Sequence, residues 1–125
     1  MRLLDWMGVP HLAEAPAAGL PYTDERRVGI ARALMFAPQF LLLDEPAAGM
    51  SETEAADLAA LINRVASDLG TGVLLIEHNV GLVLSVSDHV YVLDAGQIIE
   101  EGDRGVITAS RAVRDAYFGA DQEAA

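Results

Sequence analysis

Two short apolar runs, separated by a long amphipathic segment, dominate the hydrophobic pattern of the chain. The runs are FLLL at 40–43 and GVLLI at 72–76. Each is too short and too uniformly apolar for an amphipathic helix. Each therefore predicts a strand buried on both faces, as in a parallel sheet covered by helices. A strand, a long helix and a second strand predict a crossover that makes the two strands parallel.

The segment between these runs has a clear helical pattern. Its apolar residues recur at helical spacing on one face, and they are Leu58, Leu61, Ile62, Val65 and Leu69. Ser51 and Glu54 have the spacing of a capping box, and Gly70 stands where a glycine commonly ends a helix. We therefore expect one helix between the two strands.

Weaker periodic patterns and turn residues predict the remaining elements. In chain order these are a short amphipathic helix and a loop over 1–19, a helix over 23–38, a short helix over 79–86, a hairpin over 89–102 and a helix over 110–118. Thr23 is the predicted N-cap of the second of these helices. Two buried parallel strands cannot form a stable sheet alone, so the chain is expected to be part of an α/β domain.

The charge balance narrows the classes of partner. The chain of 125 residues has 19 acidic and 8 basic residues, a net charge of -11, and every basic residue is an arginine. Such an acidic chain repels nucleic acid and anionic membrane surfaces, so we expect it to bind neither directly. No apolar run approaches the roughly 20 residues that span a bilayer, so we expect a cytoplasmic protein without direct membrane insertion. The lack of cysteine excludes disulfides and thiolate chemistry.

Polar residues follow both apolar runs at the point where each strand is expected to end. Asp44 and Glu45 follow the first strand, and Glu77 and His78 follow the second. Ligands of parallel α/β sheets bind outside the carboxyl ends of the strands. An aspartate that ends an apolar strand is typical of the Mg²⁺ site of phosphate-transferring ATPases. Because side chains alternate along a strand, Glu45 points elsewhere and can orient or deprotonate a water molecule.

Plainer interpretations of the same residues are open. The two adjacent acids can simply solvate the end of a strand, and His78 can be an ordinary histidine at the entry to a helix. The residues at the strand ends do not decide between these interpretations by themselves. The order and spacing of the surrounding segments favour the functional one.

Three segments, taken in order, resemble the second half of the nucleotide-binding domain of ABC transporters. They are LPYTDERRVGIARAL at 20–34, FLLLDEPAAGM at 40–50 and VLLIEHN at 73–79. The resemblance runs from about Leu12 to Gly119. It implies a partial P-loop NTPase domain with parallel strands, flanking helices and a C-terminal β-hairpin. The implied parts are the end of a helical subdomain with the signature loop at 1–22, the C-terminal part of the ATPase core at 23–119 and a disordered tail at 120–125.

The resemblance also implies a role for each motif residue. Asp44 would bind Mg²⁺ as the Walker B aspartate, Glu45 would be the catalytic base, and His78 would be the switch histidine that contacts the γ-phosphate of ATP. The signature motif, which closes over the ATP of a partner subunit, would comprise Leu20, Pro21, Tyr22, Thr23 and Asp24. The D-loop, which crosses the dimer interface, would comprise Ala47, Ala48, Gly49 and Met50.

The details are most similar to one branch of this family. LPY, LLLDEPAAGM, LLIEHNVGLVLSVSDHVYVLDAGQIIEEG and VRDAYFG resemble segments of the ATP-binding subunits of branched-chain amino acid importers. This implies ATP and Mg²⁺ as cofactors and a second ABC ATPase subunit as the dimer partner. It also implies transmembrane permease subunits that hold the protein at the cytoplasmic face of the membrane.

Two departures from the family pattern limit this interpretation. The P-loop, G-x-x-x-x-G-K-[ST], needs a lysine and the chain has none, so we expect a domain that begins partway and is inactive alone. Thr23 stands where the family's signature motif has glycine. The side chain of threonine narrows the approach of a phosphate to the backbone N–H groups there. Two alternatives stay open: a non-catalytic, degenerate half-domain that pairs with another ABC ATPase subunit, and an ABC-type ATPase outside transport.

Overall fold

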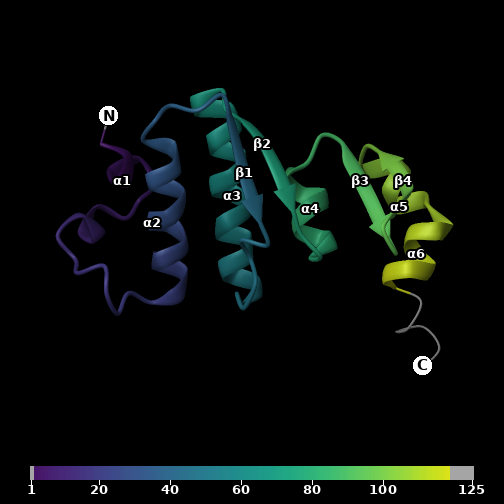
Figure 1. Cartoon of the computed structure of the whole chain (residues 1–125), viewed down its shortest axis with the longest axis horizontal. Coiled ribbons are helices and arrows are strands. Elements are labelled where there is room, and N and C mark those ends of the chain that lie inside the picture. The colour runs from purple at the N-terminus through teal and green to yellow at the C-terminus, as the bar shows by residue number, and fades with distance from the viewer. Residues whose placement is uncertain (1, 119–125) are drawn as a thin grey trace. The chain divides into compact units, whose positions relative to one another are not determined.

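The computed structural model describes residues 2–118, which fold into two compact units that divide between Leu82 and Val83 (Figure 1). The first unit contains α1 (Leu3–Trp6), η1 (Pro10–Ala13), α2 (Tyr22–Leu34), β1 (Phe40–Asp44), α3 (Glu52–Leu69) and β2 (Gly72–Ile76). Helix α4 (Val80–Val86) crosses the division, and the second unit continues with β3 (Val90–Asp94), β4 (Gln97–Gly102), α5 (Arg104–Ala109) and α6 (Arg111–Tyr117). The tail predicted at 120–125 lies outside the described residues.

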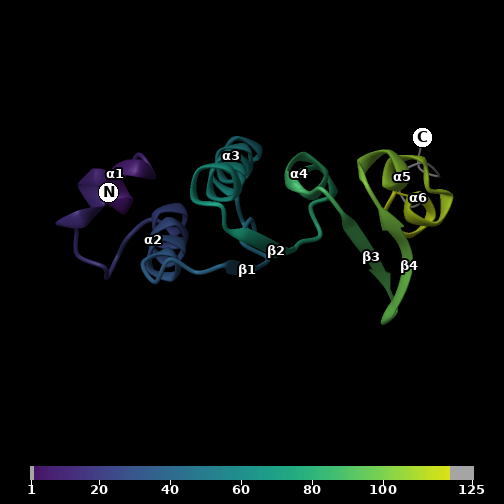
Figure 2. The same ribbon diagram turned by 90° about the horizontal axis from the view of Figure 1, so that it is seen from above.

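Strands β1 and β2 pair in parallel, with Phe40 opposite Gly72 and Asp44 opposite Ile76. Helix α3 connects the strands and lies on one face of the pair (Figure 2). The predicted parallel crossover is therefore confirmed. This register brings the carboxyl ends of the two strands level with each other, so the loops that leave them start side by side.

The prediction that both faces of the strand pair are buried is wrong, because only one face is covered. Leu41, on the face that α3 covers, is 5% exposed, whereas Leu42 and Leu74, on the other face, are 70% and 58% exposed. Side chains alternate along a strand, so every second residue of an apolar run lies on each face. No described element of the first unit shields the second face.

Helix α3 begins and ends as predicted. The Ser51 hydroxyl accepts a hydrogen bond from the Glu54 N–H (3.2 Å), and the Glu54 carboxylate accepts one from the Ser51 N–H (2.9 Å), which completes the capping box. Gly70 ends the helix in the left-handed conformation (φ 63°), which only glycine adopts at little cost. The buried residues of the helix are Ala55, Leu58, Ala59, Leu61, Ile62 and Val65.

Helix α2 begins at Tyr22, so the prediction that Thr23 is its N-cap is wrong. Pro21 occupies the cap position instead, because its fixed φ suits the turn into a helix. The Thr23 hydroxyl donates a hydrogen bond to the Glu54 carboxylate (2.9 Å) at the start of α3. A charged acceptor on the neighbouring helix thus replaces the local backbone amide that an N-cap side chain would bind.

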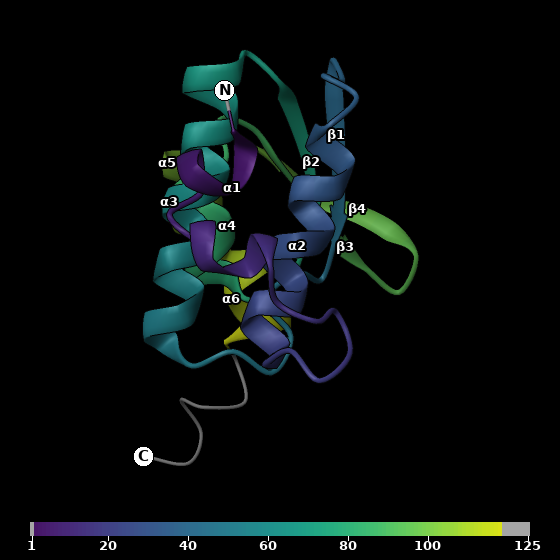
Figure 3. The same ribbon diagram turned by 90° about the vertical axis from the view of Figure 1, so that its left-hand side faces the viewer.

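The predicted short N-terminal helix is confirmed as α1, at the start of the described chain (Figure 3). Its residue Trp6 attaches it to α3. The indole N–H of Trp6 donates a hydrogen bond to Asp68 (3.2 Å), and Arg64 donates one to the Trp6 carbonyl (2.8 Å). The Arg64 guanidinium also lies 4.4 Å from the centre of the Trp6 ring, at the distance of a cation–π contact. One aromatic residue therefore fixes the start of the described chain.

The second unit is built on the predicted hairpin of β3 and β4, which is confirmed as antiparallel. Its turn residues Ala95 and Gly96 both have positive φ (48° and 79°), as a tight hairpin turn requires. The predicted last helix is confirmed as α6, with Ser110 as its N-cap. Helix α5 is an additional element, capped by Asp103. The core of this unit comprises Val90, Val92, Ile107 and Val113. None of the helices within residues 2–118 is long and apolar enough to cross a membrane.

Candidate functional site

The predicted residues of the site follow β1 and β2 at the edge where both strands end. Asp44 is the last residue of β1. The Glu45 N–H donates a hydrogen bond to the carbonyl of Ile76 (2.8 Å), which extends the strand pairing by one residue. Glu45 and Glu77 therefore leave adjacent strands at the same level. His78 follows directly, before the start of α4.

Glu45 and His78 face each other across this edge. The Oε1 atom of Glu45 lies 3.5 Å from the Nδ1 atom of His78. Both side chains are more than half exposed, so water and a ligand can reach them. Because Nδ1 is turned towards the carboxylate, the Nε2 atom of the same ring is left for another partner. The edge thus presents an accessible carboxylate base beside an imidazole that can donate a hydrogen bond.

The backbone of Glu45 has φ 46°, in the left-handed region that a residue other than glycine rarely adopts. This conformation costs about 1–2 kcal/mol for a residue with a side chain. It reverses the chain directly after β1. Hydrogen bonds from the Ala48 N–H to the Glu45 carbonyl (3.2 Å) and from the Met50 N–H to the Ala47 carbonyl (3.1 Å) close the turn that follows. The predicted D-loop is therefore a compact turn.

Asp44 presents its side chain on the exposed face of the strand pair, together with Leu42. Within residues 2–118, no three His, Cys, Asp or Glu side chains are grouped so that they could hold a metal ion unaided. Mg²⁺ usually takes one or two carboxylates from a protein and its other ligands from water and substrate phosphates. The single carboxylate of Asp44 therefore fits a Mg²⁺ ion that arrives with a nucleotide.

Glu77 has a structural role that was not predicted from the sequence. Its side chain is 0% exposed. It accepts hydrogen bonds from the backbone N–H groups of Ala47 (2.9 Å), His78 (3.1 Å) and Asn79 (3.3 Å). The sequence alone carries no signal for this role, because the apolar run predicts that Ile76 is buried. Once the structure shows Ile76 exposed, strand alternation turns the next side chain inward. A charged group at an inward position needs polar partners, and here these are backbone amides.

The predicted signature segment lies beside the predicted D-loop. A Cβ atom at Gly49 would be 3.9 Å from the ring of Tyr22. The Thr23 hydroxyl is hydrogen-bonded to Glu54, which lies just after the D-loop turn in the sequence. In the part of the chain that the structure describes, no hydrogen bond or ion pair joins the signature segment to Glu45. The structure thus brings Glu45 and His78 together, and the signature segment and D-loop together, as two adjoining groups.

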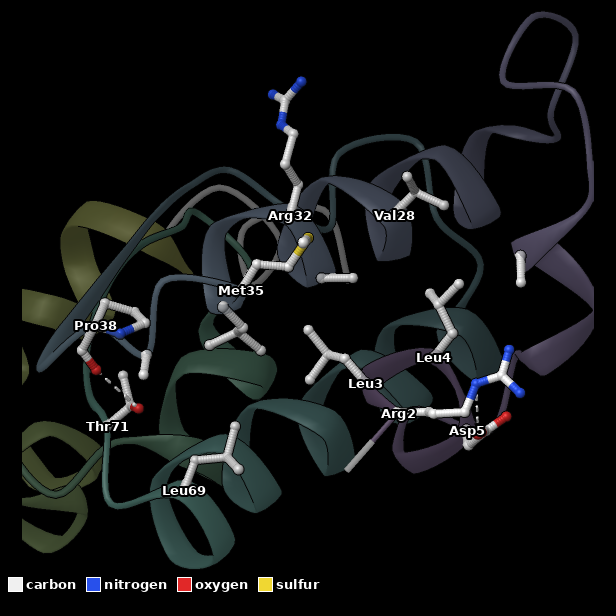
Figure 4. A pocket seen from close by; sticks show the side chains of 14 residues that line it. Arg2, Leu3, Leu4, Asp5, Val28, Arg32, Met35, Pro38, Leu69 and Thr71 are labelled. Carbon is white, nitrogen blue, oxygen red and sulfur yellow. Dashed lines mark hydrogen bonds and ion pairs between the residues drawn. The ribbon is translucent and has the colours of Figure 1, made fainter.

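A hollow of about 810 Å³ lies elsewhere in the first unit (Figure 4). Its apolar lining includes Leu3, Leu4, Val28, Met35 and Leu69. The ion pair of Arg2 and Asp5 (3.5 Å) and the hydrogen bond from the Thr71 hydroxyl to the Pro38 carbonyl (3.2 Å) border it. None of its lining residues belongs to the strand-end site, so the hollow is a separate feature.

Known proteins that resemble the chain are ATP-binding proteins, although no protein-family model matches it. It is 40% identical to the high-affinity branched-chain amino acid transport ATP-binding protein BraF of Pseudomonas aeruginosa, over 93% of this chain and 46% of BraF. It is 38% identical to the corresponding protein LivG of Escherichia coli, with the same coverage. It is 39% identical to a probable ABC transporter ATP-binding protein of Azorhizobium caulinodans, over 94% of this chain and 41% of that protein. The chain spans less than half the length of these relatives.

Solved structures of ATP-binding cassettes share the fold. An ATP-binding cassette of an ABC transporter, in its ADP conformation, matches with a TM-score of 0.83 at 32% identity, over 94% of this chain and 48% of that cassette. CbiO1 of Clostridium perfringens, part of the ABC transporter complex cbiONQ, matches with a TM-score of 0.80 at 26% identity, over 98% and 50% of the two chains. The predicted fold class is confirmed: the chain is a partial α/β domain with the fold of ABC ATPase cassettes, with parallel strands, flanking helices and a C-terminal hairpin.

Proposed function

We propose that this chain, a homologue of the C-terminal part of ABC transporter ATP-binding proteins, is the C-terminal half of an ATP-hydrolysing subunit that powers branched-chain amino acid import. The observation that carries the proposal is the 3.5 Å approach of Glu45 Oε1 to His78 Nδ1 directly beyond Asp44. The names of BraF and LivG support the substrate class. They also disfavour an ATPase outside transport.

Glu45 is the proposed base for the attacking water. Its carboxylate is 55% exposed, so a water molecule can reach it, and its backbone is fixed by the hydrogen bond to Ile76. A carboxylate within hydrogen-bonding distance of a water molecule orients that water and accepts its proton as the water attacks phosphorus. A non-catalytic half-domain has no need of a carboxylate held in a strained backbone conformation, so this geometry disfavours that alternative.

His78 is proposed to contact the γ-phosphate through Nε2. Its Nδ1 atom faces Glu45, so the carboxylate orients the ring and leaves Nε2 directed away. With a proton on each ring nitrogen, Nε2 would donate a hydrogen bond to a phosphate oxygen and stabilise the negative charge there during transfer. The same ring would hold Glu45 in position, which couples the presence of the phosphate to the position of the base.

Asp44 is the residue proposed to hold Mg²⁺, which when bound would neutralise charge on the ATP phosphates. The phosphate-binding loop must come from elsewhere, because none of the 125 residues is a lysine. ATP and Mg²⁺ are therefore proposed to bind only when this half is combined with a half that carries that loop. The division into 1–22 as the end of a helical subdomain and 23–119 as ATPase core is part of the same proposal.

The signature segment and the D-loop are proposed to form the surface that meets a second ABC ATPase subunit. The closeness of Gly49 to the Tyr22 ring supports this proposal, because the two segments are then neighbours in the first unit. The Thr23 hydroxyl is engaged with Glu54, so the backbone of the segment would have to serve a partner's phosphate. Permease subunits would hold the dimer at the cytoplasmic face of the membrane.

A chimaera tests the proposal. In it, this chain replaces the segment of BraF that it matches, so BraF supplies the other half. The purified chimaera should release phosphate from ATP in a Mg²⁺-dependent reaction. Glu45→Gln should lower turnover by about 10²–10⁴-fold, the usual loss for a general base, with little change in ATP affinity. His78→Ala should also lower turnover and spare ATP affinity.

Two results would contradict the proposal. One is a folded chimaera that binds ATP and does not hydrolyse it. The other is a Glu45→Gln variant that retains near-normal turnover, which would leave Glu45 as an acid that only solvates the end of a strand. Asp94→Asn, at the end of β3 in the second unit, is the matched control and should keep the parent turnover.

A further inference from the structure

Glu77 is the carboxylate that the proposed chemistry does not use, and it is the one most completely enclosed at the site. Its side chain is 0% exposed, between the loop that follows β1 and the loop that follows β2. Carboxylates are rarely buried unless their charge is compensated. Burial directly behind Glu45 and His78 therefore calls for an explanation.

Both oxygens of Glu77 are occupied by backbone donors from the two loops. Oε1 accepts the Ala47 N–H at 2.9 Å, from the turn that follows Glu45. Oε2 accepts the N–H groups of His78 at 3.1 Å and Asn79 at 3.3 Å. Hydrogen bonds to an ionised acceptor are the stronger class. A single side chain therefore connects the segment that carries the proposed base to the segment that carries the proposed switch histidine.

The ring of His78 is also oriented by this carboxylate. Its Nδ1 atom is 3.9 Å from Glu77 Oε2 and 3.5 Å from Glu45 Oε1, so one ring nitrogen faces two carboxylates. Glu45 is the nearer of the two carboxylates to the ring, whereas the hydrogen bonds of Glu77 are to the backbone.

We propose that Glu77 is a positioning residue that fixes the separation of Glu45 and His78 by holding their two loops in one arrangement. It touches neither substrate nor metal and acts through the backbone of both loops. This inference rests on the proposed function for its effect on turnover. Its effect on the two loops is independent of that function.

Only a carboxylate satisfies all three donors. Glutamine has the same shape, but it has one acceptor oxygen and one NH₂ group, which is a donor. If its oxygen keeps the His78 and Asn79 N–H groups, its NH₂ group faces the Ala47 N–H, and that pair repels. Glu77→Gln should therefore release the turn after β1 and retain the loop after β2. Glu77→Ala should release both loops.

Hydrogen exchange of the backbone amides tests this order of release. It is measured on the full 125-residue chain and on the BraF chimaera, for the parent, Glu77→Gln and Glu77→Ala. In the glutamine variant, exchange at Ala47 should rise by about tenfold or more, as expected for a lost hydrogen bond to a charged group, while exchange at His78 and Asn79 stays near the parent rate. In the alanine variant, exchange should rise at all three. Glu100→Gln, which alters an exposed acceptor in the hairpin, is the matched control and should leave these amides unchanged.

Turnover in the chimaera provides the second measurement. Glu77→Gln should lower kcat by about tenfold, within the loss expected when catalytic groups are misplaced, and should leave KM for ATP within about twofold. A purely structural role predicts a lower melting temperature and faster exchange throughout β1, β2 and α3, with kcat per folded molecule unchanged. That result would overturn the proposal, as would an unchanged Ala47 amide in Glu77→Gln.

The two proposals fail in distinguishable ways. If the parent chimaera has no turnover, the proposed function fails, and the exchange pattern still decides whether Glu77 holds both loops. If the parent chimaera turns over and Glu77→Gln matches it in kcat, Glu77 does not position the catalytic residues, and the ATPase function stands.

Discussion

Asp44 and Glu45 are adjacent in the sequence, yet their carboxylates lie in different surroundings. Asp44 is on the exposed face of the strand pair, and Glu45 turns towards His78. We expect Asp44→Asn in the chimaera to raise the Mg²⁺ concentration for half-maximal turnover by at least about tenfold, the smallest loss typical when even an indirect metal partner is removed. Phosphate release over a Mg²⁺ titration measures this. A Mg²⁺ dependence equal to that of the parent would exclude Asp44 as the metal residue.

Glu54 makes the folding stability depend on pH, and its contacts determine whether stability rises or falls with pH. The hydrogen bond from the Ser51 N–H, and then that from the Thr23 hydroxyl, hold the pKa of Glu54 below its ordinary value of 4.5, with Arg27 adding a smaller contribution. A lowered pKa in the folded state means that the stabilisation is complete above pH 4.5 and is lost as the pH falls through the folded pKa.

Glu54→Gln tests this contribution, because glutamine keeps the capping-box geometry and removes the charge. The melting temperature of the parent should fall more steeply than that of the variant as the pH drops below 4.5. Thermal unfolding followed by circular dichroism at several pH values measures the difference. Glu52→Gln, in the same first turn of α3, is the control. Parallel curves for parent and Glu54→Gln would show that the charge makes no contribution.

At the scale of secondary-structure elements, the open face of β1 and β2 has the clearest consequence. It presents Phe40, Leu42, Leu74 and Ile76 to solvent. Contiguous exposed apolar surface and unpaired strand edges favour association. We expect the purified chain to self-associate, and the double variant Leu42→Ser, Leu74→Ser to associate less while keeping its melting temperature. Light scattering after size-exclusion chromatography, with thermal unfolding alongside, measures both quantities.

A buried leucine provides the contrast for that experiment. Leu58→Ser, on the covered face of α3, should lower stability by about 2–5 kcal/mol, because it removes apolar packing and leaves a cavity. The argument from the open face would be wrong if the parent chain were monomeric at all concentrations. It would also be wrong if the double variant unfolded as easily as Leu58→Ser.

Elements were predictable wherever their signals are local. The capping box of Ser51 and Glu54 and the glycine at 70 lie within a few residues of the bonds that they make, so α3 was located correctly. Helix α5 is only 6 residues long, too short to show a hydrophobic period, and its Asp103 cap follows a strand directly. Which face of a strand is covered depends on partners distant in the sequence, and an apolar run does not encode it.

The same distinction explains how much of the site was predictable. Glu45 and His78 were expected at one edge of the sheet, because ligands bind at the carboxyl ends of parallel strands, but their 3.5 Å approach was not predicted. Glu77 was at the expected edge, but its partners are backbone amides, which have no signature in the sequence. Thr23 looked like an N-cap because hydroxyl residues usually are, whereas its bond to Glu54 spans 31 residues of sequence.

At the scale of the whole molecule, the lack of lysine has a direct functional consequence. We expect the purified 125-residue chain to show no Mg²⁺-dependent ATP hydrolysis, because nothing in it supplies the phosphate-cradling loop and its lysine. We also expect Asp44 and Glu45 alone to bind a nucleoside triphosphate poorly, since both side chains and the phosphates carry negative charge. Phosphate release and nucleotide binding are measured on the chain and on the chimaera in parallel. Robust release by the chain alone would refute this expectation.

Because of the left-handed backbone at Glu45, selection for stability and selection for activity should favour different residues at this position. Glycine at this position would relieve about 1–2 kcal/mol of conformational cost, and it would remove the carboxylate. In a library of all substitutions at position 45 of the chimaera, sorting for resistance to heat or protease should therefore enrich glycine. Sorting for growth that depends on transport should retain glutamate alone. If the sort for stability enriched glutamate as well, the left-handed conformation would carry no measurable cost.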